Sequence, residues 1–163
     1  FPTLNIDKIE NYFKIDIPAR EIILEKGKQI KLHHSLTIPK GFKLIFEEGS
    51  SIYFSKGAGL IVNGELSIKG SDKYPVTLNG INNEQESWSG VLVLAKDEHV
   101  NINYLRMQGG SGIFGKLRYR GAFTIHGATL MISNSSFSSN QSEDALNLVQ
   151  VRQRQSIHIC SSV

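Results

Sequence analysis

The sequence predicts an all-β protein folded as a right-handed parallel β-helix, a solenoid of about 22–24 residues per coil, and two observations support this. The first is a series of paired apolar residues with one residue between them. Because side chains along a strand alternate between its two faces, each pair marks one buried face. The second is that every third pair repeats the pattern with a nearly constant period. Three short strands per repeat are typical of a coil with three sides.

The first series of pairs lies between residues 36 and 78. It comprises Leu36/Ile38, Leu44/Phe46, Ile52/Phe54, Leu60/Val62, Leu66/Ile68 and Val76/Leu78, whose first residues step by 8, 8, 8, 6 and 10. Gly, Asn, Ser or Lys stands at most of the intervening corners, which predicts tight turns. Asn63-Gly64 would also fit the two-residue loop of an antiparallel meander. The nearly constant period over three pairs favours the coil.

The same rhythm returns in the second half of the chain. Its members are Phe123/Ile125, Leu130/Ile132, Phe137 and Leu146/Leu148, with steps of 7, 7 and 9. Val91/Val93 and residues 100–107 supply the coil between the two series. Residues 80–87 and 109–121 interrupt the rhythm and are expected to form loops that project from corners. We therefore expect a β-helix domain of about five coils over residues 21–150.

The two ends of the chain lack this regularity. Residues 1–20 are expected to form an N-terminal cap or linker, with a short helix over residues 5–13 that covers the first coil. Residues 151–163, "VRQRQSIHICSSV", are expected to be an atypical, poorly ordered tail. An uncovered last coil would favour self-association through its exposed edge, assisted by oxidation of Cys160.

Composition and charge restrict the classes of function. The length of 163 residues fits one domain, and the net charge of +3 comes from scattered basic residues, so no nucleic acid partner is expected. One cysteine and the absence of zinc-ligand spacing predict neither an internal disulfide nor a metal site, and no cofactor is expected. No apolar run is long enough to span a membrane. Because the chain begins at Phe1, we expect a processed or excised piece of an extracellular or cell-surface protein whose signal is not in this chain.

Four stretches carry a resemblance to a known family. Residues 38–78, 88–94, 121–140 and 142–148 resemble a pectin-lyase-like β-helix module, and more narrowly the β-helix segment of bacterial spore-coat-protein-H-like proteins. The resemblance covers about residues 28–150. In that group a further coil with additional acidic residues follows "EDALN", whereas residues 151–163 here do not continue the pattern. The resemblance therefore implies the fold but not a complete catalytic set.

A basic, aromatic cluster is the candidate ligand site. It comprises Trp88, Arg106, Lys116, Arg118, Tyr119 and Arg120, in and beside the loop at residues 109–121. Guanidinium and ammonium groups bind carboxylates and phosphates, and exposed aromatic rings stack on sugars. We expect Trp88 and Tyr119 to be exposed, and the ligand to be an acidic polysaccharide or a cell-surface glycan.

Glu143 and Asp144 are the candidate acid pair of an alternative, enzymatic function. Glycoside hydrolases use two carboxyl groups that flank the scissile bond. Adjacent strand residues point to opposite faces, and the window one coil upstream, residues 121–127, holds no carboxylate. The pair is therefore interpreted as a corner feature, and Asn134 likewise as a corner residue that bonds to the neighbouring coil. A calcium-dependent lyase is disfavoured because residues 99–142 contain no Asp or Glu.

The sequence thus favours a non-enzymatic extracellular or surface β-helix scaffold that binds acidic glycans weakly. The alternative is a fragment of a polysaccharide lyase or glycoside hydrolase that lacks its full catalytic set. His33 and His34 lie at a turn and are interpreted as solvated side chains, and His126 lacks a recognisable Ser or Cys partner, so no catalytic triad is predicted.

Overall fold

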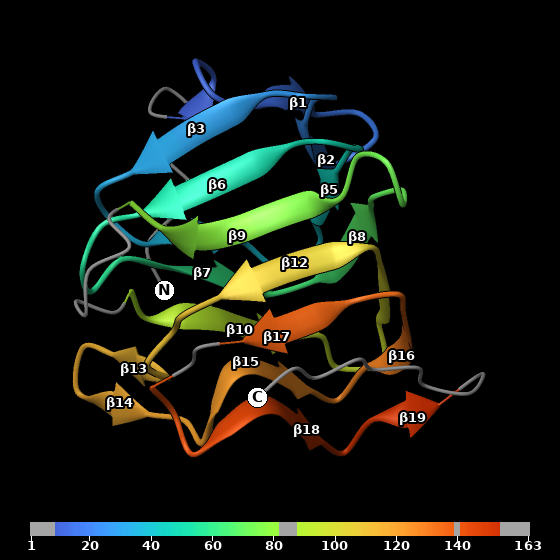
Figure 1. Cartoon of the computed structure of the whole chain (residues 1–163). Coiled ribbons are helices and arrows are strands. Elements are labelled where there is room, and N and C mark those ends of the chain that lie inside the picture. Colours follow the sequence, from blue (N-terminus) through green and yellow to red (C-terminus); the bar gives the residue numbers. More distant parts are fainter. Residues whose placement is uncertain (1–8, 82–87, 139–140, 154–163) are drawn as a thin grey trace.

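The computed structural model describes residues 9–81, 88–138 and 141–153, and the described chain is a parallel β-solenoid (Figure 1). Three sheets form its sides. Sheet A contains β1 (Lys14–Asp16), β2 (Glu21–Leu24), β5 (Lys43–Phe46), β8 (Glu65–Lys69), β11 (His99–Asn103), β16 (Thr129–Ser133) and β19 (Arg152–Gln153). Sheet B contains β3 (Gln29–Leu32), β6 (Ser51–Phe54), β9 (Val76–Gly80), β12 (Leu105–Gln108) and β17 (Ser136–Ser138). Sheet C contains β4 (Leu36–Ile38), β7 (Gly59–Val62), β10 (Gly90–Leu94), β15 (Gly121–His126) and β18 (Asp144–Val149).

The chain visits the sheets in the order A, B, C and then repeats. Coil 1 is β2–β4, coil 2 is β5–β7, coil 3 is β8–β10, coil 4 is β11, β12 and β15, and coil 5 is β16–β18, after which β19 begins another coil. Strands of successive coils pair in parallel within each sheet. The predicted parallel coil of about five turns is confirmed, and the meander is excluded because β7 and β8, joined by Asn63-Gly64, lie in different sheets.

The register reproduces the predicted repeat in sheet A of coils 1–3, whereas in sheet B Ile52 lies opposite Leu78 and not opposite Val76, so the offset there exceeds the predicted 22–24 residues. Ile22 lies opposite Leu44, and Leu44 lies opposite Leu66, so the offset along the chain is the same at both steps. The offset between Leu66 and Val100 is longer, because the segment at residues 80–87 lies between them. The second insertion, at residues 109–121, contains the two-stranded hairpin β13 (Ile113–Phe114) and β14 (Leu117–Arg118).

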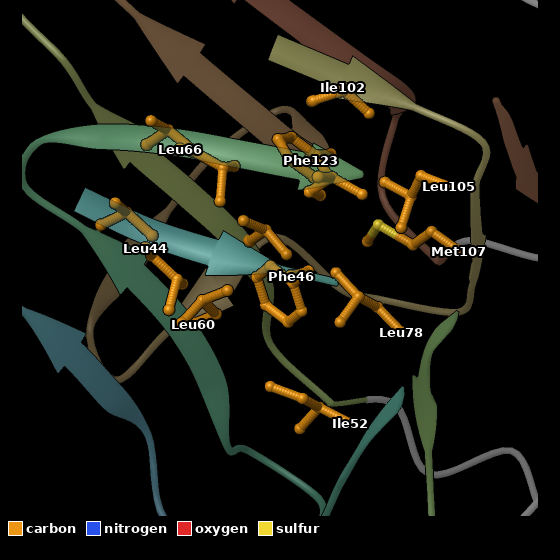
Figure 2. Close-up of a cluster of buried hydrophobic side chains, with 14 of the residues drawn as sticks. Leu44, Phe46, Ile52, Leu60, Leu66, Leu78, Ile102, Leu105, Met107 and Phe123 are labelled. Carbon is orange, nitrogen blue, oxygen red and sulfur yellow. The ribbon is translucent and has the colours of Figure 1, made fainter. Parts of the chain in front are cut away.

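Columns of apolar side chains fill the interior, and Figure 2 shows how they converge from the three sheets. The six core positions singled out by the sequence pattern are all buried: Leu44, Phe46, Leu66, Ile68, Leu130 and Ile132. Full burial of each such side chain contributes about 1.5–3 kcal/mol to folding before chain entropy is subtracted. Because every coil buries its inner face against its neighbours, the coils are stable only as a stack.

The corners between sheets A and B stack by backbone hydrogen bonds as the strands do. Gly27 and Gly49 occupy equivalent corners and adopt φ angles of 68° and 71°, a left-handed conformation that favours glycine. The Gly27 N–H donates to the carbonyl of Glu48 at 3.0 Å, and the Gly49 N–H donates to that of Tyr74 at 3.0 Å. The glycines at these corners therefore have a conformational role.

At the N-terminal edge of sheet A, β1 pairs antiparallel with β2. Ile9 and Phe13 are buried against the core, and the N–H groups of Tyr12 and Phe13 both donate to the Ile9 carbonyl. The helix expected over residues 5–13 lies partly outside the described residues, and residues 10–12 form a turn. Cys160 and most of the predicted tail also lie outside the described residues.

Candidate functional site

The hairpin β13–β14 occupies the corner between sheets B and C in coil 4, at the lower left of Figure 1. Gly115 and Lys116 form its two-residue turn, and Gly115 has a φ of 59°. A glycine with positive φ at the first turn position is typical of a type II′ turn, whose twist matches the flanking strands. The hairpin exposes the side chains of Lys116, Leu117 and Arg118 to solvent. It forms the projection expected over residues 109–121.

An aromatic anchor holds this hairpin against the outer face of sheet C. Phe114 is only 9% exposed, and a methyl group on Gly59 would lie 2.7 Å from its Cε1 atom, so the ring covers Gly59 directly. Tyr119 contacts Phe114 edge to face, with ring centroids 6.0 Å apart. Its N–H donates to the Gly112 carbonyl at 2.7 Å. These contacts of Phe114 and Tyr119 therefore hold in place the hairpin that carries the basic side chains.

Arg120 lies at the base of the hairpin and contacts coil 5. Its Nε lies 3.8 Å from Glu143 Oε2, and both side chains are more than three-quarters exposed, at 79% and 78%. Such a solvated ion pair contributes little stability. Lys116 and Arg118 have no ion-pair partner within the described residues. The free positive charge of the hairpin therefore resides on these two side chains.

The structure does not bring Arg106 to the hairpin. Arg106 lies near the start of β12, and its Nη1 donates to the carbonyl of Asn134 at 2.8 Å. Asn134 lies at the corner between β16 and β17, where sheet A meets sheet B. The hairpin follows the other end of β12. The sequence cluster is thus divided between two corners of the solenoid, because proximity in sequence along a strand does not bring its two ends together.

Trp88 corrects the expectation of an exposed aromatic. It is 1% exposed, stacks on Phe54 with ring centroids 4.5 Å apart, and donates from Nε1 to the Gln108 carbonyl at 3.0 Å. If side chains alternated regularly backward from the inward Val91, through Gly90, Trp88 would lie on the outer face. Gly90 has a φ of 105°, which interrupts the extended backbone and changes the facing of the residues before it. Trp88 is therefore a core residue.

The acid pair lies at the edge of sheet C that faces the hairpin base. Asp144 begins β18 opposite Gly121, and its N–H donates to the Arg120 carbonyl at 2.9 Å. The Ser142 hydroxyl donates to the Asp144 carbonyl at 2.5 Å, while Glu143 makes the ion pair with Arg120. Both acidic residues are exposed. Across the described ranges, no three His, Cys, Asp or Glu side chains are grouped closely enough to hold a metal ion.

Asn134 has the corner role that the sequence predicts. Its Nδ2 donates to Asn103 Oδ1 at 3.0 Å, and the Ser133 hydroxyl donates to the same oxygen at 2.8 Å. Asn134 itself has a φ of 50°, which asparagine tolerates better than most residues. These contacts join coils 4 and 5.

One polar pair was missed by the sequence analysis. His33 Nδ1 lies 2.7 Å from Ser55 Oγ, and the two residues occupy equivalent corners of coils 1 and 2. Their separation of 22 residues equals the coil period, which is the signal that could have identified the pair. The contact is exposed, and no carboxylate orients His33 within the part of the chain that the structure describes. A hydroxyl without an oriented base is a poor nucleophile, so we assign the pair a structural role.

No protein-family model, curated protein or solved structure matches this chain. The solenoid architecture therefore rests on the strand pairing itself, and the narrower family resemblance stays a prediction. Among the described residues, no helix has the length and apolar character needed to cross a membrane.

Proposed function

We propose that this chain is a non-enzymatic β-helix scaffold, extracellular or on a cell surface, which binds acidic glycans weakly through the β13–β14 hairpin. The observation that supports the proposal best is an anchored hairpin that exposes Lys116 and Arg118 without ion-pair partners among the described residues. The pectin-lyase-like and spore-coat-protein-H-like resemblance is consistent with this function and forms part of the proposal.

The chemistry of the hairpin suits a flexible anionic polymer. Arg118 offers a planar guanidinium for two hydrogen bonds to a carboxylate or sulfate, and Lys116 adds a point charge beside it. Ile113, which is 36% exposed, lies opposite Arg118 in the hairpin and therefore on the same face, where it offers an apolar surface for the C–H face of a sugar ring. Exposed charge pairs are strongly screened by salt, so binding is weak at physiological ionic strength.

Trp88 and Arg106 are excluded from this site because one is buried and the other bonds to a distant corner. Tyr119 supports the hairpin through Phe114, and Arg120 contributes a charge already paired with Glu143. The proposed contact surface is therefore smaller than the sequence cluster.

Chromatography on immobilised polygalacturonate tests this function. The unmodified chain should be retained at low salt, and the double variant Lys116→Ala/Arg118→Ala should elute at clearly lower salt. Lys31→Ala/Lys40→Ala is a matched control because it removes the same charge from two exposed lysines away from the hairpin. Equal loss of retention in both double variants would show that only net charge matters.

The hydrolase or lyase alternative makes a different prediction in the same experiment. Incubation with the polysaccharide should leave its chain length unchanged if the protein is a scaffold. Release of shorter products, lost in Asp144→Ala, would instead establish the enzymatic function. Self-association through the C-terminal coil also stays a prediction, and sedimentation of the reduced chain over a range of concentrations would test it.

A further inference from the structure

A groove of about 340 Å³ lies at the corner where sheet C passes into sheet A. Its lining comes from four successive coils and includes Arg20, Phe42, Lys43, Glu65 and Glu98. The hairpin lies at the opposite end of the sheet C strands, between sheets B and C. The groove is therefore separate from the surface proposed above, and its function does not depend on that proposal.

Unequal corner lengths explain the groove. Three residues separate the inward Val62 from Leu66 in passing from coil 2 to coil 3. The corresponding corner one coil earlier, between Ile38 and Leu44, contains five residues, and the corner one coil later, between the inward Val93 and Val100, contains six. A short corner between two longer ones is drawn toward the solenoid axis and leaves a notch.

Gly64 permits this short corner. A methyl group on Gly64 would collide with the carbonyl oxygen of Phe42 in the longer corner beside it. The two corners are thus in backbone contact at Gly64 and Phe42.

The groove carries charges of both signs with a negative excess. Three carboxylates, of Glu21, Glu65 and Glu98, line it together with two cations, of Arg20 and Lys43. Lys43 Nζ lies 3.6 Å from Glu65 Oε2. The half-buried carboxylate of Glu98 and the guanidinium of Arg20 make no hydrogen bond or ion pair within the described residues. A negative and a positive group are therefore both available to a ligand.

The arrangement of these groups identifies the chemical class of the ligand. The carboxylates do not converge into a metal cluster within the described ranges. A volume near the lower end of the roughly 300–1,000 Å³ that is typical of ligand pockets fits one ring. The half-buried ring of Phe42 offers an apolar surface on which a sugar ring can pack.

We propose that this groove binds one amino-sugar ring that carries a free ammonium group, as in a de-N-acetylated hexosamine unit of a polysaccharide. The ammonium group bonds to Glu98, the ring packs on Phe42, and Arg20 donates to a hydroxyl oxygen. The negative excess favours the cation, and a charge-assisted hydrogen bond to Glu98 supplies selectivity over the N-acetylated sugar.

Calorimetric titration with a glucosamine trimer, with the N-acetylglucosamine trimer as comparison, tests the proposal. The unmodified chain should bind the first and not the second. Glu98→Gln should raise the Kd for the glucosamine trimer by about tenfold or more, the usual effect of losing a charged hydrogen bond. Glu25→Gln removes a charge from an exposed corner residue outside the groove and should leave the Kd unchanged.

A second variant separates specific binding from general charge attraction. Ala19 lies exposed in the lining, so Ala19→Trp fills the groove without altering its charge, and it should abolish binding while the circular dichroism stays β-rich. Lys116→Ala/Arg118→Ala should bind the glucosamine trimer as the unmodified chain does. Absence of binding at millimolar ligand, equal binding of both trimers, or binding that persists in Ala19→Trp would each overturn the proposal.

Discussion

Two corners of this solenoid, at opposite ends of the sheet C strands, differ in length from the other corners in opposite senses. The corner before β15 is lengthened and carries the β13–β14 hairpin, whereas the corner before β8 is shortened and leaves the groove. The inward columns continue through both departures, with Leu66 opposite Val100 and Val91 opposite Phe123. In this fold the paired strands form the stable stack, and the lengths of the corners determine where the surface projects and where it is hollowed.

We expect the largest loss of stability from a change in the inward columns of apolar side chains, which continue past both corners. Leu66→Asp places an unpaired charge in a position that is 1% exposed, and this should cost several kcal/mol and unfold the domain. Circular dichroism and a thermal melt measure the loss. Lys69→Asp, on the same strand but exposed, is the control and should leave the fold intact. A Leu66→Asp variant with an unchanged melting temperature would mean that the register is wrong.

The shortened corner should show the next largest effect. Gly64→Ala forces a methyl group against the Phe42 carbonyl and should cost about 1–3 kcal/mol, as overpacking of a tight site does. Gly57→Ala is the comparison, because that site has a φ of 73° and no heavy atom within 4 Å of an added methyl. It should cost only about 1 kcal/mol of backbone strain. Similar costs for the two variants, measured by urea unfolding, would contradict the close backbone contact at Gly64.

A change in the lengthened corner should affect only the β13–β14 hairpin. Phe114→Ala removes the ring that covers Gly59 and should free the hairpin while the solenoid stays folded. Trypsin cleavage after Lys116 or Arg118 should then accelerate about tenfold, which corresponds to roughly 1.4 kcal/mol of local stability. Leu117→Ala, from the same hairpin but 60% exposed, should leave the cleavage rate unchanged. Equal rates in the two variants would show that Phe114 is not the anchor.

We expect the smallest effect on stability at an exposed corner between sheets A and B, away from both the lengthened and the shortened corner. Lys26 Nζ contacts Glu48 Oε1, and this hydrogen-bonded pair, with a further bond from Ser71, holds the pKa of Glu48 below its usual range. A lowered pKa in the folded state gives a stabilisation that is present at neutral pH and is lost as the pH falls below about 4. Melting temperatures measured from pH 6 to pH 3 should therefore fall slightly less in Glu48→Gln. If the melting temperature depended on pH identically in the unmodified chain and in Glu48→Gln, the pair would not contribute to stability.

The sequence predicted the columns because inward positions are fixed by a period of two along each strand and by the coil repeat. Leu44 and Leu130 lie where that pattern places them. Trp88 does not lie where the pattern places it, because the positive φ of Gly90 changes the direction of nearby side chains. The alternation of apolar residues in the sequence gives no indication of that backbone angle. Proximity in sequence groups Arg106 with the hairpin, although Arg106 lies near the start of β12 and the hairpin follows the end of that strand.

The groove shows a different limit of sequence interpretation. Its signal is present as the step from Leu60 to Leu66, which is shorter than the steps on either side of it but by itself indicates only a turn. A short corner becomes a groove only when the corners on both sides of it are longer. That condition relates segments about one coil apart, so it becomes visible once the parallel register is known.

Both surfaces depend on the parallel register of the coils, which scalar couplings across hydrogen bonds in solution NMR would detect residue by residue. The parallel solenoid predicts a coupling from the Glu47 amide to the Leu24 carbonyl, bonded at 3.0 Å, and from the Ser51 amide to the Lys28 carbonyl, bonded at 2.9 Å. Both connect residues one coil apart. Couplings between β5 and β6 instead, as an antiparallel meander requires, would contradict the solenoid and the two surfaces derived from it.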